Sequence, residues 1–187
     1  STKYKKGTEH PIHTRKVAVE SNEEEILLDG NKMAVGFDYF DLGDFEVSKN
    51  NAILAYSYDT LSRRMYDIRF KDLETGELFN EIIKNTTGSM EWANDNKSVF
   101  YTQQDPKTLR SNKIFKHILG TNPNQDQLIF EEKDETFSCG IYKTKSQKFL
   151  MISSSSTLTD EVRYISADNP SQTPILFQER TRGLEYK

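Results

Sequence analysis

Residues 45–59, FEVSKNNAILAYSYD, read as two short strands around a tight turn. The strand Phe45–Val47 ends at Ser48, residues 49–51 form a polar turn, and Ala52–Tyr58 forms an apolar and aromatic strand. Asparagine is favoured in such turns because it tolerates a positive φ and hydrogen-bonds to nearby backbone groups. The stretch therefore predicts a β-hairpin.

The same hairpin pattern occurs twice more along the chain. It recurs in MEWANDNKSVFYTQQD, residues 90–105, and in GIYKTKSQKFLMIS, residues 140–153. Aligning the start of each turn gives an offset of 45 residues from Ser48 to Ala93 and of 51 residues from Ala93 to Thr144. Repeats of roughly 40–50 residues made of short strands are typical of propeller blades rather than of helical solenoids.

A second set of paired strands lies between these hairpins. In each pair, a strand of alternating apolar and polar residues precedes a polar turn, and a short aliphatic strand follows it. Such alternation predicts one buried and one exposed face. The pairs are 11–19 with 25–28, 65–73 with 77–79, 113–119 with 127–130, and 161–167 with 174–177. The two sets interleave, so each full unit has four antiparallel strands.

These units predict an all-β fold, a partial β-propeller that forms a single domain over residues 1–187. We expect about three complete four-stranded antiparallel blades, a leading half-blade and a trailing strand, in an arc that does not close. The blades are expected at about 44–83, 88–132 and 136–180, the half-blade at about 4–29 and the trailing strand at 183–187. Short helical turns are expected at 31–35 and 105–110.

The composition argues against two classes of partner. The chain has 187 residues, of which 35% are hydrophobic and 29% charged, and its net charge is −4. No apolar run approaches the roughly 20 residues of a membrane-spanning helix, so we expect no membrane partner. Charges of both signs are interspersed without a basic stripe, so we do not expect nucleic acid as a partner either.

The N-terminus and the single cysteine bear on the compartment. Ser1–Arg15 contains basic residues with no apolar segment behind them, so we expect no secretory signal, and a start without Met suggests a cut or processed chain. Cys139 cannot form an intramolecular disulfide, and we interpret it as a buried small apolar residue on an inner strand. We therefore expect a reducing compartment, the cytoplasm.

Several separated motifs occur in a familiar order. They are EILLDGN (25–31), GFDYFDLG (36–43), SRRMY (62–66), KDLETG (71–76), WANDN (92–96), VFYT (99–102), Asp105-Pro106, and residues 152–158 with EVRY (161–164). Together they resemble the β-propeller domain of the oligopeptidase B branch of the prolyl oligopeptidase family of serine peptidases. The resemblance covers essentially the whole chain.

The resemblance implies a function for the protein to which the chain belongs. Family members place a propeller over an α/β-hydrolase domain that holds a Ser-Asp-His triad, and the propeller restricts entry to oligopeptides. Oligopeptidase B enzymes cleave after Arg and Lys. By this resemblance the chain is a substrate-gating propeller segment, whose partners are a C-terminal α/β-hydrolase domain and oligopeptides. The alternative is a free-standing TolB-like propeller that acts as a binding or adaptor module. A hydrolase sequence further along the reading frame would separate the two.

The chain itself carries no catalytic motif. A hydrolase of this class requires a strained Gly-x-Ser-x-Gly turn that exposes its nucleophile. No such sequence is present, and Ser153–Ser156 lacks flanking glycines and lies at the end of a strand. We therefore expect no catalytic residue, no cofactor and no activity of the chain alone. His117 lies mid-strand without a carboxylate or cysteine pattern nearby, and we interpret it as a surface or packing residue.

We expect no metal site. His10 and His13 are three residues apart, and residues at that spacing on a strand face opposite sides, so we interpret both as exposed strand histidines. Asp38, Asp41 and Asp44 lack the alternate-position ligands and the distal Glu of a calcium-binding EF-hand loop. We interpret these three as turn and cap residues.

Arg63 and Arg64 are candidate inter-domain contacts. They lie in the connection that enters the third strand of their blade, and connections at one end of a propeller are where a partner domain would lie. A guanidinium group suits bidentate pairing with a carboxylate across an interface. An exposed arginine pair on a loop is the equally supported alternative. Trp92 and Phe137 are expected in the core between blades.

The two ends of the arc are expected to lack partners. A blade buries one face against its neighbour, so unpaired apolar faces and strand edges favour association with another chain. The residues expected to be exposed are Ile12, Val17 and Ile26–Leu28 at the leading end, and Val162, Tyr164, Ile175 and Phe177 at the trailing end. We therefore expect self-association through the ends.

Overall fold

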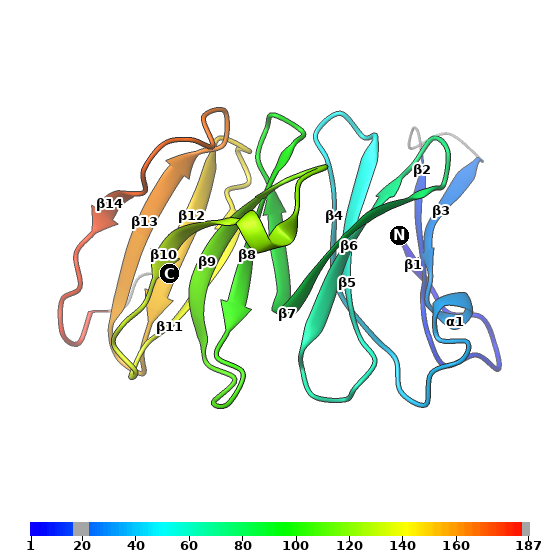
Figure 1. Cartoon of the computed structure of the whole chain (residues 1–187), viewed down its shortest axis with the longest axis horizontal. Helices are drawn as coiled ribbons and strands as arrows, with labels where there is room; N and C mark the ends of the chain where they lie inside the picture. The colour runs from blue at the N-terminus through cyan, green and yellow to red at the C-terminus, as the bar shows by residue number, and fades with distance from the viewer. Residues whose placement is uncertain (17–22, 185–187) are drawn as a thin grey trace.

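The computed structural model describes residues 1–16 and 23–184. In these residues the chain forms short antiparallel strands, one helical turn, α1 (Gly30–Met33), and one 3-10 turn, η1 (Pro123–Gln125) (Figure 1). The strands are β1 (Thr2–Lys3), β2 (Ile12–Lys16), β3 (Glu24–Asp29), β4 (Asp41–Val47), β5 (Ile53–Asp59), β6 (Tyr66–Asp72), β7 (Leu78–Trp92), β8 (Ser98–Gln104), β9 (Ser111–Ile118), β10 (Gln127–Glu131), β11 (Ser138–Lys143), β12 (Phe149–Ser155), β13 (Asp160–Ser166) and β14 (Ile175–Gln178).

The strands form three sheets that do not close on one another. Their orders are β1-β2-β3, β4 through β10 in sequence, and β11 through β14 in sequence, and every neighbouring pair is antiparallel. In Figure 1 the sheets lie side by side, with the N-terminal sheet at one end and β14 at the other. The predicted all-β, partial propeller is thereby confirmed.

β7 connects two groups of strands. It continues without a break from Leu78 to Trp92, pairing first with β6 and then with β8, and it runs obliquely between the two groups in Figure 1. From the sequence, the last strand of one blade is expected at 77–79 and the start of the next blade at about residue 88. Instead the chain bends within one strand, because Asn85 and Gly88 adopt positive φ angles of 59° and 90° and the register shifts between Thr86 and Met90.

Glycine is required at this bend for a second reason. A Cβ atom on Gly88 would lie 3.0 Å from Cγ of Tyr66 and 3.1 Å from Oγ of Ser57. The Ser57 hydroxyl donates to the carbonyl oxygen of Gly88 at 2.9 Å. The close approach of β5 to the bend therefore depends on the missing side chain.

The three predicted hairpin turns share one geometry. In each, the first turn residue donates its backbone N–H to the carbonyl oxygen five residues later, at 2.8–2.9 Å, in the pairs Ser48 to Ile53, Ala93 to Ser98 and Thr144 to Phe149. The fourth turn residue is left-handed each time, with φ of 61° at Asn51, 58° at Asn96 and 61° at Gln147. These positions keep the offsets of 45 and 51 residues that the sequence indicates.

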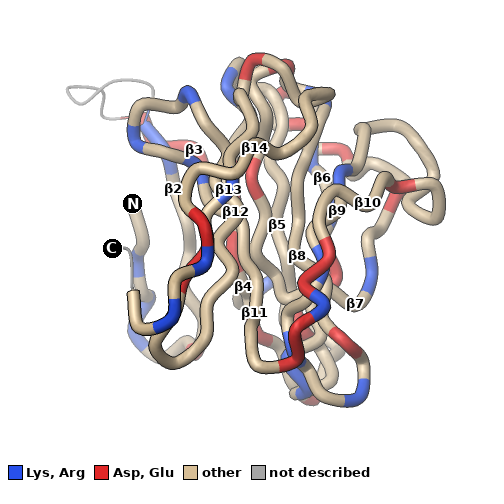
Figure 2. The backbone as a smooth tube through the Cα atoms, turned by 90° about the vertical axis from the view of Figure 1, so that its left-hand side faces the viewer, with Lys and Arg blue, Asp and Glu red and all other residues tan. Residues whose placement is uncertain are grey.

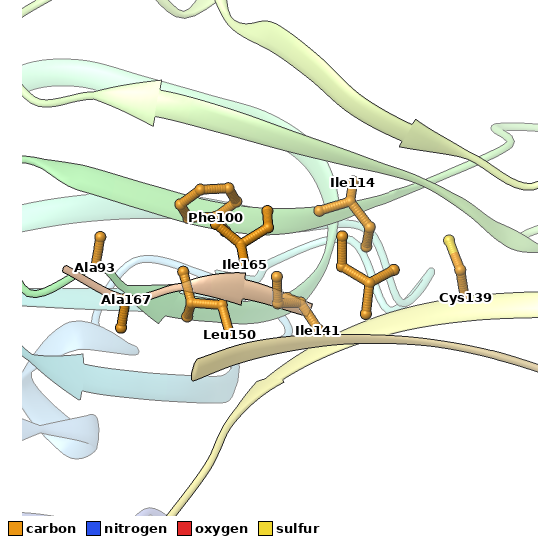
Figure 3. Packing of buried hydrophobic residues seen from close by; sticks show 9 residues of the cluster. Ala93, Phe100, Ile114, Cys139, Ile141, Leu150, Ile165 and Ala167 are labelled. Carbon is orange, nitrogen blue, oxygen red and sulfur yellow. The ribbon is translucent and has the colours of Figure 1, made fainter. Parts of the chain in front are cut away.

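Apolar side chains fill the spaces between successive groups of strands. Figure 3 shows one such cluster, in which side chains from β8 and β9 face side chains from β11, β12 and β13. Its buried members are Ala93, Phe100, Ile114, Cys139, Ile141, Leu150, Ile152, Ile165 and Ala167. Burying each large side chain of this kind contributes roughly 1.5–3 kcal/mol, so these clusters hold neighbouring sheets together.

Two further clusters complete the core of the described residues. One joins β5 and β6 to β7 and β8 and contains Ala55, Ile68, Phe70, Ile83, Met90, Trp92, Val99 and Tyr101. The other joins the N-terminal sheet to β5 and contains Leu27, Leu28, Leu54 and Tyr56. The predicted core positions of Trp92 and Cys139 are confirmed. Phe137 is also buried, but it lies in the β10–β11 connection beneath the Arg180 guanidinium, 3.7 Å from its ring centroid.

The leading end differs from the expectation in two respects. β1 adds a third strand to the predicted pair, and Leu27 and Leu28 are buried against the next sheet, so only Ile26 of that run is largely exposed. The exposed face expected at Leu27 and Leu28 is therefore wrong, because these side chains cover Leu54 and Tyr56. Val17 and the turn at 20–22 lie outside the described residues.

The trailing end also departs from the expectation. Val162 is buried, whereas Ile175 and Phe177 are exposed as expected. Gly183 and Leu184 lie in a turn rather than in a strand, and residues 185–187 lie outside the described residues.

The helical turn expected at 31–35 forms as α1, because Oδ1 of Asp29 accepts the backbone N–H groups of Asn31 and Lys32. No helix in the described ranges 1–16 and 23–184 has the length and apolar character needed to cross a membrane.

Candidate functional site

The Arg63–Arg64 connection between β5 and β6 is held by a buried carboxylate. Asp59 ends β5, and its oxygens accept backbone N–H groups from Leu61 at 2.7 Å, Arg63 at 2.9 Å and Arg64 at 2.8 Å. The side-chain amide of Gln104, at the end of β8, donates to the carbonyl oxygen of Arg64 at 2.6 Å. The loop is therefore fixed both to its own strand and to the next group of strands.

This backbone arrangement directs the arginine pair away from the core. Arg63 and Arg64 are both exposed, and Arg64 is left-handed with φ of 55°. Within the described part of the chain, the ion pairs of arginine involve Arg15, Arg163 and Arg180. The two guanidinium groups are thus presented on an ordered loop without an ion-pair partner in these residues.

A second candidate region lies on the strands that begin successive groups. These strands are β4, the second half of β7, and β11, and β7 contacts both of the others. The indole N–H of Trp92 donates to the carbonyl oxygen of Glu46 at 3.0 Å, and the backbone N–H of Lys143 donates to Oε1 of Glu91 at 3.0 Å. Hydrogen bonds therefore join these inner strands directly. In a propeller such strands surround the central channel.

The inner strands gather acidic side chains in partly desolvated surroundings. The pKa of Glu46 is raised to about 7, first by burial and then by the nearby carboxylates of Glu91 and Asp44, against the lowering effect of Lys143. Burial likewise raises the pKa of Glu91 and lowers that of Lys143. Like charges close together disfavour ionisation of both groups. Glu46 is therefore a carboxyl group whose charge changes near neutral pH.

The three aspartates of the expected turns lie in a bend and on β4. Asp38 lies in a bend, but β4 begins at Asp41 and contains Asp44, so the turn and cap interpretation is wrong for these two residues. The hydroxyl of Tyr66 donates to Oδ2 of Asp41 at 2.5 Å. Across residues 1–16 and 23–184, no group of three or more His, Cys, Asp or Glu side chains is arranged to hold a metal ion.

The two N-terminal histidines are half-buried rather than exposed. His10 precedes β2 and packs edge-on against Phe40 with ring centroids 5.5 Å apart, whereas His13 lies within β2, 4.5 Å from the ring of Phe45. Burial and the N-terminal amine lower the pKa of His13. Both rings therefore serve packing between the N-terminal sheet and its neighbour.

His117 is the polar residue whose environment the sequence analysis missed. It is fully buried in β9, its ring stacks on Phe70 at 5.5 Å, and its Nδ1 lies 2.8 Å from Oδ1 of Asp126. The Tyr101 hydroxyl donates to Oδ2 of the same carboxylate at 3.0 Å. Asp126 follows the turn η1, nine residues after His117. The sequence signal that could have predicted their contact is the polar turn between β9 and β10, which brings the chain back alongside His117.

The serine run lies in a structural network rather than in a nucleophile turn. Ser154 is buried within β12 and donates to the carboxylate of Glu132. Arg180 donates to the same carboxylate at 2.6 Å, and Arg180 also covers Phe137. These contacts tie the segment after β14 to the β10–β11 connection.

Comparison with known proteins places this geometry in a family. Residues 2–187 match the model of the N-terminal β-propeller domain of prolyl oligopeptidase. The chain belongs to the prolyl oligopeptidase family. The match covers the arginine loop, the inner strands and all three sheets.

Two relatives in the prolyl oligopeptidase family are similar over nearly the whole chain. Dipeptidyl aminopeptidase BI of Pseudoxanthomonas mexicana is 38% identical over 196 residues, covering 97% of this chain and 27% of that protein. Protease 2 of Moraxella lacunata is 36% identical over 188 residues, again covering 97% of this chain and 27% of that protein. The chain therefore spans about a quarter of the length of these relatives, which contain further domains beyond it.

Two solved structures have the same arrangement of strands. Oligopeptidase B from Leishmania major superimposes with a TM-score of 0.91 at 27% identity, covering all of this chain and 27% of that one. Oligopeptidase B from Trypanosoma brucei superimposes with a TM-score of 0.86 at 28% identity, covering 97% and 26%. The resemblance to oligopeptidase B propellers that the sequence motifs indicate is confirmed.

Proposed function

We propose that the chain is the substrate-gating propeller segment of a serine oligopeptidase, and that it carries no catalytic residue of its own. Its partner would be an α/β-hydrolase domain of the same full-length protein, and the substrates would be oligopeptides cleaved after Arg or Lys. The observation that carries the proposal is the match of residues 2–187 to a peptidase propeller domain. The likeness to Protease 2 and oligopeptidase B supports the same class of substrate.

The inner strands are suited to forming a rigid channel wall. The Trp92-to-Glu46 and Lys143-to-Glu91 hydrogen bonds join the first strands of neighbouring groups, and apolar clusters fill the space behind them. A wall fixed in this way excludes folded proteins sterically, whereas a flexible peptide can pass along the channel. The carboxyl groups of Glu46 and Glu91 at this wall would favour a cationic peptide over an anionic one.

Arg63 and Arg64 are proposed to contact the hydrolase domain. The loop that carries them is held by Asp59 and Gln104, so docking would order few additional backbone atoms. A guanidinium pair presented in this way can form bidentate bonds with carboxylates of a facing domain.

We also propose a cytoplasmic location for the protein. The buried free thiol of Cys139, whose pKa burial raises to about 12, is consistent with it.

The experiment compares peptide cleavage by the full-length protein and by the 187-residue chain. We expect the full-length protein to cleave a short fluorogenic peptide containing one Arg, and to leave the same sequence intact when it lies in a loop of a folded domain. The 187-residue chain should cleave neither substrate. Equal cleavage of the free and the folded substrate would contradict gating. Turnover by the chain alone that a serine-directed covalent inhibitor blocks would contradict the absence of catalytic residues.

A further inference from the structure

A cavity between the segment from α1 to β4 and the strands β5 and β6 is lined by aromatic side chains and one arginine. Its volume is about 280 Å³, and we call it the aromatic pocket. The residues that line it are Met33, Phe37, Phe40, Tyr56, Tyr58 and Arg69. The rings form a continuous row, with centroids 6.4 Å apart from Phe37 to Phe40, 6.1 Å from Phe40 to Tyr58, and 6.2 Å from Tyr58 to Tyr56. The walls are therefore fixed by ring-to-ring packing.

The charged group of this pocket has one unpaired donor atom. The Nε atom of Arg69 is buried and donates to no atom of the described residues, and Arg69 takes part in none of their arginine ion pairs. Asp67 lies on the same face of β6, but it accepts the backbone N–H of Asn85 at 3.4 Å and forms no ion pair with Arg69. A buried donor that remains unpaired is costly, so such a group marks a place where an acceptor is missing.

The acceptor that best fits is a carboxylate. A guanidinium group presents a planar fork of donors that matches two carboxylate oxygens, and such bonds are strongest in surroundings that exclude water. The size of the cavity also limits the ligand. It is at the lower limit of pockets that hold small molecules, which favours a single acidic side chain over a larger free ligand.

The surface beside the aromatic pocket offers further apolar side chains to a ligand. Phe37 and Phe40 also line a second cavity of about 400 Å³, whose lining includes Val35, Tyr39, Glu9 and Asp38. Val35 is 78% exposed and Phe37 is 51% exposed. Exposed aromatic and aliphatic side chains next to a charged anchor are characteristic of protein interfaces. The occupant therefore has an apolar residue next to its acidic one.

We propose that the aromatic pocket binds a polypeptide segment that carries an acidic side chain next to an apolar one, with the carboxylate paired to Arg69. The apolar neighbour covers Phe37 and Val35. The proposal does not depend on the peptide-gating role, because it concerns the space between the segment from α1 to β4 and the strands β5 and β6 rather than the inner strands.

The test measures binding of two matched peptides by NMR titration. The probes are N-acetyl-Leu-Glu-Leu-amide and its uncharged counterpart N-acetyl-Leu-Gln-Leu-amide. The protein should bind the Glu peptide about tenfold more tightly than the Gln peptide, with shifts at the backbone amides of Phe40 and Tyr58. Arg69→Met should abolish this preference. Arg182→Met is the control, because it removes the same charge from an exposed position after β14 and should leave the preference unchanged.

Three results would overturn the proposal. The first is that neither peptide binds, and the second is that both peptides bind equally to the unmodified protein; neither result requires a variant to fold. The third is that phenylacetate binds as tightly as the Glu peptide, which would assign the pocket to a free carboxylate instead of a polypeptide segment. If Arg69→Met fails to fold, Arg69→Lys replaces it, because Lys keeps the charge but loses the fork and should reduce the preference in part.

Discussion

At the scale of single residues, the carboxyl group of Glu46 on an inner strand makes the stability of the chain depend on pH. Its pKa is raised from an ordinary value of 4.5 to about 7, mainly by burial. The folded state therefore binds this proton more tightly than the unfolded state, and stability that is present below pH 4.5 is lost as the pH rises towards about 7.

Replacing Glu46 by Gln should remove this pH dependence. The variant should be more stable than the unmodified chain by about 1–2 kcal/mol above pH 7, after allowance for the partial exposure of the side chain, and the difference should disappear near pH 4. Urea unfolding at several pH values measures it. Glu74→Gln, in the exposed turn after β6, is the control and should leave the profile unchanged. Superimposable profiles for Glu46→Gln and the unmodified chain would count against the burial of this carboxyl group.

His117 is the second residue whose surroundings lead to a prediction. Replacing it by Ala removes a fully buried ring from Phe70 and leaves Asp126 with one hydrogen-bond partner fewer. The free energy of unfolding should fall by about 2–4 kcal/mol, because the substitution leaves a cavity and removes a hydrogen-bond partner from the carboxylate of Asp126. His13→Ala, at a half-buried site, should cost less than about 1 kcal/mol. Equal losses for the two variants, measured in urea, would contradict the role assigned to His117.

At the scale of elements, the carboxylate of Asp59 accepts most of the hydrogen bonds that hold the β5–β6 connection. Asp59→Ala would leave three backbone N–H groups of the loop without their acceptor. We expect the loop to open locally, so that trypsin cleaves after Arg63 and Arg64 at least about fivefold faster, because local opening controls such cleavage. Asp72→Ala removes a similar acceptor from the next turn and should not alter cleavage at this loop. Unchanged cleavage in Asp59→Ala would show that the loop is held by other contacts.

The repeating turns were predictable from the sequence because their signal is local. Asn51 and Asn96 are residues that tolerate a positive φ, and each is followed by an apolar strand. Gln147 adopts the same conformation with a less favourable residue, and only its place in the repeat reveals it. The paired turns and the all-β fold therefore follow from short stretches of sequence.

The features that the sequence did not reveal depend on contacts between distant residues. β7 continues through residues 84–87 because it pairs with β6 on one part of its length and with β8 on the other. Leu27 and Leu28 are buried by Leu54 and Tyr56, which lie more than twenty residues away in the sequence. Likewise, the aromatic pocket joins α1 to β6, and no single stretch contains its lining. Tertiary packing, rather than local pattern, decides these positions.

At the scale of the whole molecule, the charges are spread over both ends of the sheets. Figure 2 shows Lys and Arg interleaved with Asp and Glu along the tube rather than gathered on one side. A docking interface would therefore depend on specific charged groups rather than on the overall electrostatic field of the molecule. Arg63 and Arg64 are the groups that we propose for this role, because their loop is held by Asp59 and their guanidinium groups have no ion pair in the described residues.

Replacing Arg63 and Arg64 by Ala in the full-length protein should reduce kcat/KM for a short Arg peptide by about tenfold or more if the pairs are buried at the domain interface. The stability of the 187-residue chain should change by less than about 0.5 kcal/mol, because both side chains are exposed there. Lys145→Ala with Lys148→Ala removes the same charge at the opposite end of the sheets and is the control. Unchanged kinetics in the arginine variant would support the alternative, in which Arg63 and Arg64 are exposed loop residues that contact no other domain.

The outer face of the last sheet leads to a prediction about association. Apolar side chains from all four strands lie on this face around a cavity of about 310 Å³, and they include Tyr142, Phe149, Met151, Tyr164, Ile175 and Phe177. β14 pairs only with β13 among the described strands, so its other edge is unpaired. At about 25 cal/mol per Å², covering a few hundred Å² of such surface contributes several kcal/mol.

That contribution is enough to favour self-association of the 187-residue chain at micromolar concentration. Sedimentation velocity should detect a dimer, and Phe177→Asp should shift the chain to a monomer because a charge would be buried without a partner. Leu158→Asp is the matched control: Leu158 is 62% exposed and Phe177 is 67% exposed, but Leu158 lies in the β12–β13 loop, away from this face. A monomer that binds no hydrophobic dye, or a dimer that Phe177→Asp leaves intact, would show that this face does not drive association.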